Sequence, residues 1–264
     1  MGITAYFAYA KKSFLKRSAY RFDHFMGILS TSLQIFIYWE IYRALYGNNS
    51  KIDGITFSMV TTNFVLALGL NSGFFIDDFY LPQKIWDGSL ATEFLRPVSF
   101  RGRMVAENLG NALFNCIFRF TPALIIAIVM VGICPPQSVC SFLLFVVSAI
   151  FGYGVLWSIS FAVQMLAFWL VNIWSIVTIK NVFINVLSGS MIPLWFLPEW
   201  LKAVIEWTPF ASIYFTPVQI YLGQITGSEV LIKCVIQGVW ILIIYFIGSI
   251  LWKMGQRKLV VHGG

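Results

Sequence analysis

Residues 188–223 read SGSMIPLWFLPEWLKAVIEWTPFASIYFTPVQIYLG, and this stretch decides the fold. It begins inside an apolar run, then scatters glycine and proline among aromatic residues and carries only three charges: Glu199, Lys202 and Glu206. In lipid, every backbone N–H and C=O needs a partner, so a broken helix persists only where protein or water covers the break. The stretch therefore predicts a membrane helix that ends in short, partly re-entrant helices at one surface. This arrangement favours transport across the bilayer over simple anchoring.

The composition agrees with a membrane setting. The chain has 264 residues, of which 59% are hydrophobic and 11% are charged, whereas soluble domains average about 25% charged residues. So much apolar surface does not fit one water-soluble core of this size. The formal charge of +7 is explained by Lys and Arg in cytoplasmic loops, so we expect no nucleic-acid partner.

Six apolar runs are long enough to cross the hydrocarbon core, which needs about 20 residues. We expect transmembrane helices at residues 24–46, 55–77, 107–133, 139–168, 171–196 and 230–252. The predicted fold is an all-α integral membrane protein with six transmembrane helices, in which residues 1–264 form one domain. Its other parts are an amino-terminal interfacial helix (1–23), a cytoplasmic loop (78–106) and re-entrant outer helices between spans five and six (188–223).

Basic residues set the expected orientation. Most of the 18 Lys and Arg residues fall before span one, between spans two and three, or after span six. Because cytoplasmic loops carry the excess of Lys and Arg, both termini are predicted to be cytoplasmic, with 188–223 on the outer side. No cleavable signal peptide is evident at the amino end.

Two segments on the cytoplasmic side stand out. In residues 1–23, aromatic residues alternate with a basic cluster, which favours a helix lying among lipid headgroups over a solvated basic tail. In residues 78–106, a short amphipathic segment ends at Arg96-Pro97, since the residue before proline avoids the helical region. Such a segment suits a groove on another protein; an ordinary loop whose aromatic side chains reach the membrane interface is the alternative.

Several kinds of chemistry are disfavoured. The chain lacks a GxxxxGK[ST] nucleotide-binding loop and the HExxH and GxSxG motifs. His24 and His262 are the only histidines, so metal sites or triads built on histidine are not expected. The four cysteines show no metal-binding spacing, and the pairing of Cys134 with Cys140 stays open.

Polar residues inside spans are expensive and therefore candidates for function. Arg119 falls midway along span three and Lys180 lies in span five; each can line a cavity, pair with a partner or reach toward the interface. Asn63 and Asn185 can line a path or bridge helices equally well. We take Arg119, Lys180, Asn63 and Asn185 as candidate path-lining residues.

Two groups of motifs resemble the permease subunits of type-2 ATP-binding-cassette exporters, in particular the small bacterial six-span branch. The first is Gly88-Ser89-Leu90 followed by Phe94-Leu95-Arg96-Pro97, where Phe94 replaces the usual Leu. The second comprises Ser188, Gly189, Pro193, Leu197-Pro198, Pro209-Phe210, Pro217 and Leu222-Gly223. The likeness covers nearly the whole chain in topology, although each motif is short.

The resemblance implies a non-enzymatic half-transporter in the bacterial plasma membrane. Its partners would be a second permease copy or a homologous permease, membrane lipid, and cytoplasmic ATPase subunits that bind the ATP and Mg²⁺, so no cofactor or metal is expected in this chain. Coupling to the ATPase would involve Ile85, Trp86, Asp87, Gly88, Leu90, Glu93, Leu95, Arg96 and Pro97, with Trp86 and Leu90 inserted into the ATPase groove and Asp87, Glu93 and Arg96 at its rim. The outer gate would involve Ser188, Gly189, Pro193, Pro198, Pro209 and Phe210.

The main alternative is a secondary transporter or channel driven by an ion gradient. Such proteins place ionisable residues midway along several spans, whereas Arg119 is the only charge expected near a midplane here. A membrane enzyme acting on lipid is disfavoured by the scarcity of histidine and of clustered carboxylates. A scaffold that transports nothing is the third alternative.

Overall fold

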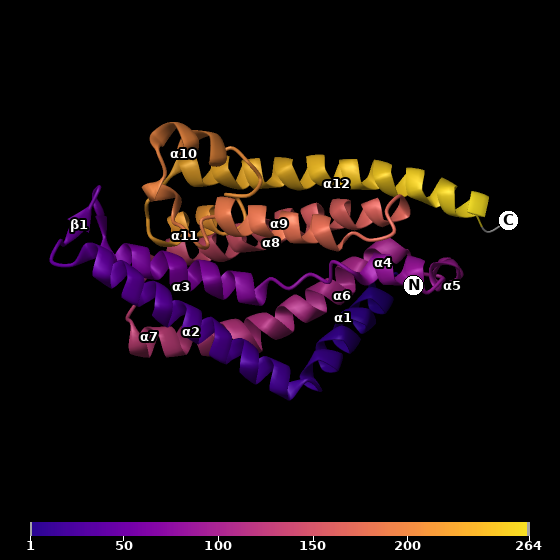
Figure 1. Cartoon of the computed structure of the whole chain (residues 1–264), viewed down its shortest axis with the longest axis horizontal. Helices are drawn as coiled ribbons and strands as arrows, with labels where there is room; N and C mark the ends of the chain where they lie inside the picture. The colour runs from indigo at the N-terminus through magenta and orange to yellow at the C-terminus, as the bar shows by residue number, and fades with distance from the viewer. Residues whose placement is uncertain (1, 263–264) are drawn as a thin grey trace.

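The computed structural model describes residues 2–262, and its regular secondary structure is helical apart from one small hairpin. Figure 1 shows its elements in chain order. They are α1 (Gly2–Ser18), α2 (Arg21–Tyr46), β1 (Lys51–Ile52), β2 (Ile55–Thr56), α3 (Phe57–Gly73), α4 (Tyr80–Trp86), α5 (Leu90–Phe94), α6 (Phe100–Asn115), η1 (Cys116–Phe120), α7 (Thr121–Met130), α8 (Val139–Met165), η2 (Leu166–Phe168), α9 (Trp174–Leu187), η3 (Leu194–Phe196), α10 (Glu199–Ile205), α11 (Phe215–Tyr221) and α12 (Ser228–His262).

Three helical segments within residues 2–262 are long and apolar enough to cross a membrane: Phe100–Met130, Val139–Phe168 and Ser228–Lys258. Their surfaces expose large apolar side chains, such as Val129, Ile150 and Leu242. Lipid is the solvent that suits such surfaces, so the chain is a membrane protein. The helices α2, α3 and α9 lie at the other three predicted spans.

Some predicted boundaries differ from the structure. The helix of the third predicted span, which we call the third long helix, begins at Phe100 rather than at residue 107. Arg103 and Glu107 interrupt the apolar run there but not the helix. The predicted loop 78–106 therefore contains two short helices and the start of α6. At the amino end, α1 stops at Ser18, and Arg21 already belongs to α2.

The third long helix contains a π-helical turn, η1. Pro122 follows it and has no N–H to donate, so the regular helical bonding pattern cannot continue. The Thr121 hydroxyl donates to the carbonyl of Cys116 at 2.9 Å. Turns of this kind often occur at functional sites, and η1 carries Arg119.

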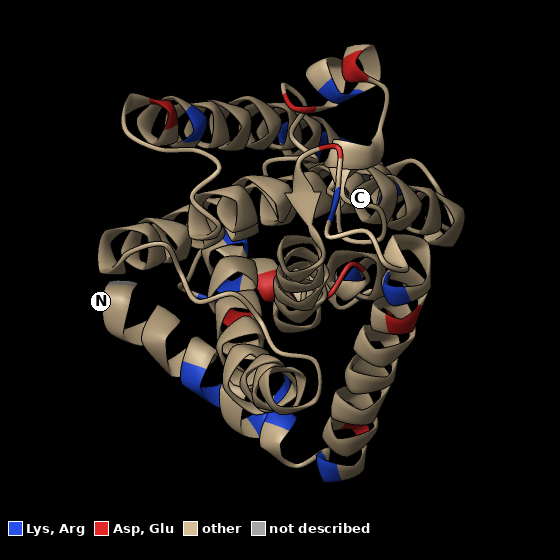
Figure 2. Cartoon of the chain, turned by 90° about the vertical axis from the view of Figure 1, so that its left-hand side faces the viewer, with Lys and Arg blue, Asp and Glu red and all other residues tan. Residues whose placement is uncertain are grey.

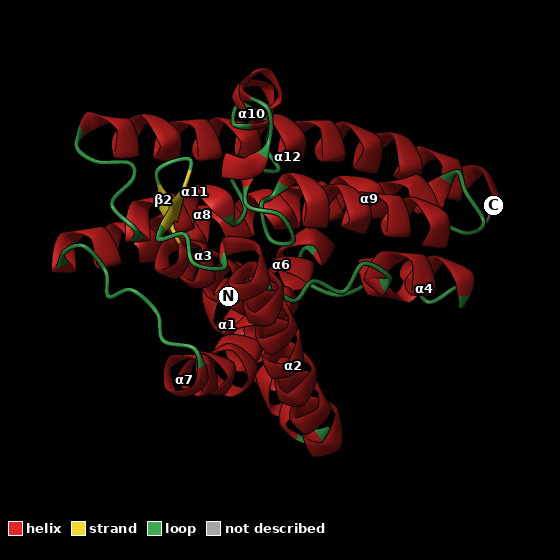
Figure 3. Ribbon diagram, turned by 60° about the vertical axis from the view of Figure 1, so that its left-hand side comes forward, coloured by secondary structure: helices red, strands yellow, loops and turns green. Residues whose placement is uncertain are grey.

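Long helices pack side by side: α12 runs along α8, and α1 runs along α6 (Figures 1 and 3). Gly110 on α6 allows the close approach of α1, because a Cβ there would collide with the carbonyl oxygen of Ala10. Between α2 and α3, the strands pair antiparallel through a turn at Asp53 and Gly54, both with positive φ. Such residues suit the tight turns of two-residue hairpins.

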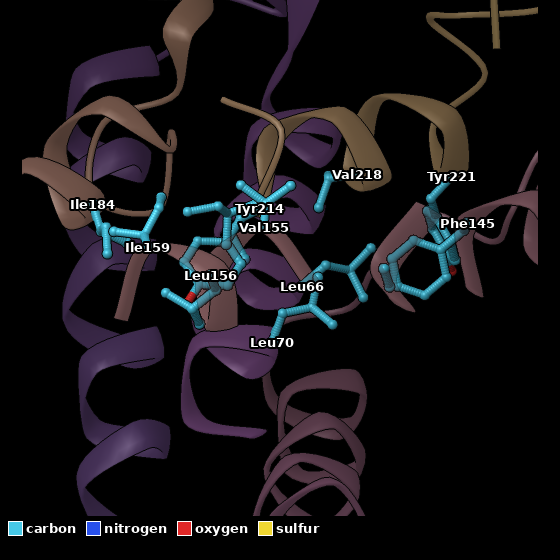
Figure 4. Packing of buried hydrophobic residues seen from close by; sticks show 13 residues of the cluster. Leu66, Leu70, Phe145, Val155, Leu156, Ile159, Ile184, Tyr214, Val218 and Tyr221 are labelled. Atoms are coloured by element: carbon cyan, nitrogen blue, oxygen red, sulfur yellow. The ribbon is translucent and has the colours of Figure 1, made fainter. Parts of the chain in front are cut away.

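The main core joins α3, α8, α9 and α11 (Figure 4). Leu70 of α3, Leu156 of α8, Ile184 of α9 and Val218 of α11 are among its members. All residues of α11 are buried. Pro217 lies in the first turn of α11, where proline is tolerated, so α11 packs in the protein core as a short intact helix.

Candidate functional site

The first candidate element is the α4–α5 hairpin, which we define as residues 80–94. Gly88 makes the turn between its helices with φ of +69°, a conformation that glycine adopts without a steric cost. Asp87 fixes the same turn, since its carboxylate accepts a hydrogen bond from the backbone N–H of Ser89 at 2.9 Å. The predicted amphipathic segment is thus an ordered helical hairpin.

One side of this hairpin is anchored in the protein. Leu81 is fully buried and Leu90 is 2% exposed. Both belong to a core cluster with residues of α6, α8, η2 and α12, among them Phe100, Phe161 and Trp252. The prediction that Leu90 inserts into a partner's groove is therefore wrong, because its side chain already packs inside this chain.

The opposite side of the hairpin and the residues after it are exposed. Trp86 is 49% exposed and Leu95 is 85% exposed. The other exposed predicted coupling residues are Asp87, Gly88, Arg96 and Pro97, while Ile85 is half-buried. We call Trp86, Asp87 and Gly88, together with Leu95, Arg96 and Pro97 directly after α5, the hairpin tip. These exposed side chains are apolar and charged, and they adjoin a base that the core holds in place.

Glu93 lies at the centre of a charge network instead of at an exposed rim. It is 4% exposed and forms ion pairs with Lys84 at 3.3 Å, Arg96 at 3.1 Å and the buried guanidinium of Arg103. Burial raises the pKa of Glu93, but the hydrogen bonds and charges of its basic neighbours, Arg103 foremost, outweigh burial and leave this pKa lowered. Glu93 is therefore charged and ties α5 to α4 and α6; its predicted rim position is wrong.

A second candidate feature is a cavity of about 590 Å³ between α2, α3, η1 and α9, which we call the central cavity. Three of the four predicted path-lining residues, Arg119, Lys180 and Asn185, line it together. Asn185 accepts a hydrogen bond from Asn71 at 3.1 Å. The Arg119 guanidinium donates to the backbone carbonyl of Asp23 at 3.1 Å and lies 3.7 Å from its carboxylate.

Lys180 has a partner that the sequence did not indicate. Its Nζ atom donates to both carboxylate oxygens of Asp78, at 2.7 and 2.6 Å, and to the hydroxyl of Ser160 at 2.9 Å. No local pattern pairs Asp78 with a residue 102 positions away. The available signal was a lysine inside an apolar helix, which requires a counter-charge.

Asn63 does not line the central cavity. Its side chain is fully buried, and its Nδ2 donates to the carbonyl oxygen of Gly189 at 3.4 Å. Asn63 thus connects α3 to the point where the chain leaves α9.

The outer break starts at that point. Ser188 ends α9, and Gly189 follows with φ of +74°. Pro193 and Pro198 each directly precede a short helix, while Pro209 and Phe210 lie in the turns before α11. Phe210 stacks on Phe183 of α9. The predicted breaks are present; their role as a gate stays a prediction.

Two remaining questions about the site are metal binding and the state of the cysteines. Among residues 2–262, no group of three or more His, Cys, Asp or Glu is placed to hold a metal ion. Cys134 and Cys140 are free thiols. Contacts of Lys180 with Asp78 and of Asn63 with Gly189 join α9 and α3 to the segments before the hairpin and at the outer break.

Comparison with known proteins adds one finding. The model of a family described as "ABC-2 family transporter protein" matches residues 29–263, which is most of the chain. No match was found among curated proteins or among solved structures.

Proposed function

Because the chain belongs to the ABC-2 transporter family, we propose that it is the membrane-spanning subunit of an ATP-binding-cassette exporter. It forms one half of the translocation path, and a separate cytoplasmic ATPase subunit binds ATP and Mg²⁺ and supplies the energy. The observation that carries this proposal is the hairpin tip, a set of exposed apolar and charged side chains beside an anchored base. Exposed aromatic and aliphatic side chains on a rigid element are typical of docking sites.

The proposed topology has six spans in the plasma membrane of a bacterium. The three long apolar segments are spans three, four and six, and α2, α3 and α9 are spans one, two and five. The hairpin tip then faces the cytoplasm with both termini, and the β1–β2 hairpin faces outward. In Figure 1 these two hairpins lie at opposite ends of the molecule, which supports this orientation.

The coupling pathway begins at the hairpin. Asp78 lies two residues before α4 and holds Lys180 of α9. A displacement of the hairpin would therefore pull on α9 directly. At its other end, α9 leads into Gly189, whose carbonyl is held by Asn63. We propose that closure of the ATPase dimer moves the hairpin and that α9 transmits this motion to the outer break.

The path itself is proposed to form between two permeases. The central cavity is lined by polar side chains of α2, α3, η1 and α9 and would be completed by a second copy or a homologous permease. Both carboxylates that line the cavity, Asp23 and Asp78, are ion-paired. This pairing supports a structural role for them and disfavours the ion-gradient alternative, which needs a carboxylate free to exchange a proton or ion.

Docking is tested by purifying the chain together with a candidate partner ATPase subunit from the same organism. We expect Trp86→Ala and Leu95→Asp to reduce both the amount of bound ATPase and its permease-stimulated ATP hydrolysis about tenfold, which is the loss of roughly 1.4 kcal/mol of binding. The matched control is Trp200→Ala on α10, since Trp200 is 70% exposed and lies on the proposed outer side. Unchanged ATPase binding in both hairpin variants, with normal membrane insertion, would contradict the proposal.

A further inference from the structure

A second cavity, which shares Asp23 and Phe75 with the central one, lies between α1, the α4–α5 hairpin and α6 and has a volume of about 600 Å³. We call it the basic cavity. Its lining includes six cationic side chains but only four carboxylates. The cations are Lys12, Lys16, Arg17, Lys84, Arg96 and Arg103. The positive and negative charges along this lining therefore do not balance.

The strongest sign of a missing anion is Arg103. Its side chain is 1% exposed, and its Nη1 atom has no hydrogen-bond partner. The nearest carboxylate, Glu93, is already shared with Lys84 and Arg96, and Glu107 lies 3.9 Å from Nε. A buried guanidinium donor without an acceptor is costly, and an anion in the cavity would supply the acceptor.

The α1 side of the cavity supplies two further cations. Lys12 and Lys16 are one helical turn apart and therefore share a face of α1. Neither has an ion pair or side-chain hydrogen bond within residues 2–262. Ser13, on the same helix, fixes α1 to α6 by donating to Asn111 at 2.8 Å. Figure 2 shows the basic residues along the helix that starts at the N label.

Another part of α1 faces away from the protein and is apolar. Ile3 is 89% exposed, Phe7 is 70% exposed and Leu15 is 55% exposed. Ile3 and Phe7 lie one helical turn apart, and Leu15 lies on the adjoining part of the exposed surface, with Lys11 between it and Phe7. An exposed helix surface that combines apolar and basic side chains suits the membrane interface, which puts the basic cavity at the depth of lipid headgroups.

We infer that the basic cavity binds a phosphate group, contributed by the headgroup of an anionic phospholipid. Phosphate fits because arginine and lysine supply it with charge-assisted hydrogen bonds. Arg103 would contribute its free Nη1 from the floor of the cavity, and Lys12 and Lys16 would close on the phosphate from α1. The bound lipid would then join α1 to the α4–α5 hairpin. The inference concerns binding alone and does not depend on the proposed function.

Lipid binding can be measured on the full chain in nanodiscs by native mass spectrometry. The probes are phosphatidylglycerol, which is anionic, and phosphatidylcholine, which is zwitterionic. We expect tighter binding of phosphatidylglycerol, and a loss of roughly tenfold in this preference in the double variant Lys12→Gln/Lys16→Gln. The matched control is Lys11→Gln/Lys253→Gln, which removes the same charge from exposed residues that do not line the cavity.

Each outcome decides the inference. Equal loss in the double variant and in the control would assign the preference to general surface charge and overturn the site, as would equal binding of both lipids. Displacement of phosphatidylglycerol by millimolar inorganic phosphate, in the parent but not in the double variant, would keep the site and identify free phosphate as its ligand. No displacement, together with loss in the double variant alone, would support the lipid headgroup.

Discussion

Lys180 and Asp78 form a closed ion pair in which every proton of the lysine ammonium has an acceptor. Two acceptors are the carboxylate oxygens of Asp78, and the third is the hydroxyl of Ser160. An ammonium group has three N–H donors, so the site is satisfied without water. The pair joins α9 to the segment that leads into α4 and borders the central cavity. A displacement of the segment before α4 would therefore also displace α9. Because all three N–H groups of Lys180 are occupied, none is available to bind a transported anion.

The first prediction concerns this pair. We expect Asp78→Asn and Lys180→Met each to lower the free energy of unfolding by about 3 kcal/mol, because each leaves one buried charge without its partner. The double variant should lose less than the sum of the two, since it leaves no uncompensated charge. Thermal or denaturant unfolding of the purified chain in detergent measures all three variants. Additive losses would show that the two side chains do not interact.

The second prediction concerns Glu93. Glu93→Gln removes the charge that neutralises Arg103, so we expect a loss of about 3 kcal/mol in the free energy of unfolding. Glu40→Gln is the matched control: Glu40 pairs with Arg43 at 3.7 Å, but both side chains are largely exposed. Exposed pairs contribute little, so the control should lose less than about 0.5 kcal/mol. Equal effects in the two variants would contradict the central role of Glu93.

The third prediction is the pH dependence that follows from Glu93. Its pKa is lowered from the ordinary value of 4.5, so the folded state holds the carboxylate in its charged form more strongly than the unfolded state does. The resulting stabilisation is complete above the ordinary value and is lost as the pH falls through the lowered pKa. The melting temperatures of the parent and Glu93→Gln should therefore converge below pH 4.5. A constant difference across that range would contradict the assignment.

The sequence predicted the positions of the helices well, because apolar runs and proline breaks are local signals. The breaks at Gly189, Pro193 and Pro198 are present. The start of the third long helix was missed because hydropathy falls where a helix is amphipathic. Arg103 sits in that part of α6, buried and paired, and no apolar run marks it.

The side-chain environment of the site was harder to predict. Leu90 and Leu95 lie on a segment too short to show a helical period, so their opposite exposures, 2% and 85%, were not apparent. Only the packing of α5 against α6 and α12 separates them. The pairing of Asp78 with Lys180 depends on contacts between distant parts of the chain, which one sequence without relatives does not reveal.

The fourth prediction tests the start of the outer break. Gly189→Ala places a Cβ on a residue with φ of +74°, 3.1 Å from the ring of Phe215, so we expect a loss of about 1–2 kcal/mol in the free energy of unfolding. Gly238→Ala is the control: Gly238 lies within α12 with open space around it, and alanine is the better helix former. This variant should be as stable as the parent or more stable. If Gly189→Ala matched it, the left-handed turn would not be required.

The fifth prediction concerns orientation. Asn49 precedes β1 and Ala91 lies in α5, and these elements are at opposite ends of the molecule in Figure 1. Because basic residues flank the α5 end, a cysteine at position 91 should react with a membrane-impermeant maleimide only after the cells are permeabilised. A cysteine at position 49 should react in intact cells. The background replaces the four native cysteines, of which Cys140 is exposed. Labelling of position 91 in intact cells would place the hairpin tip outside the cell, where no ATPase could reach it, and would refute the proposed coupling.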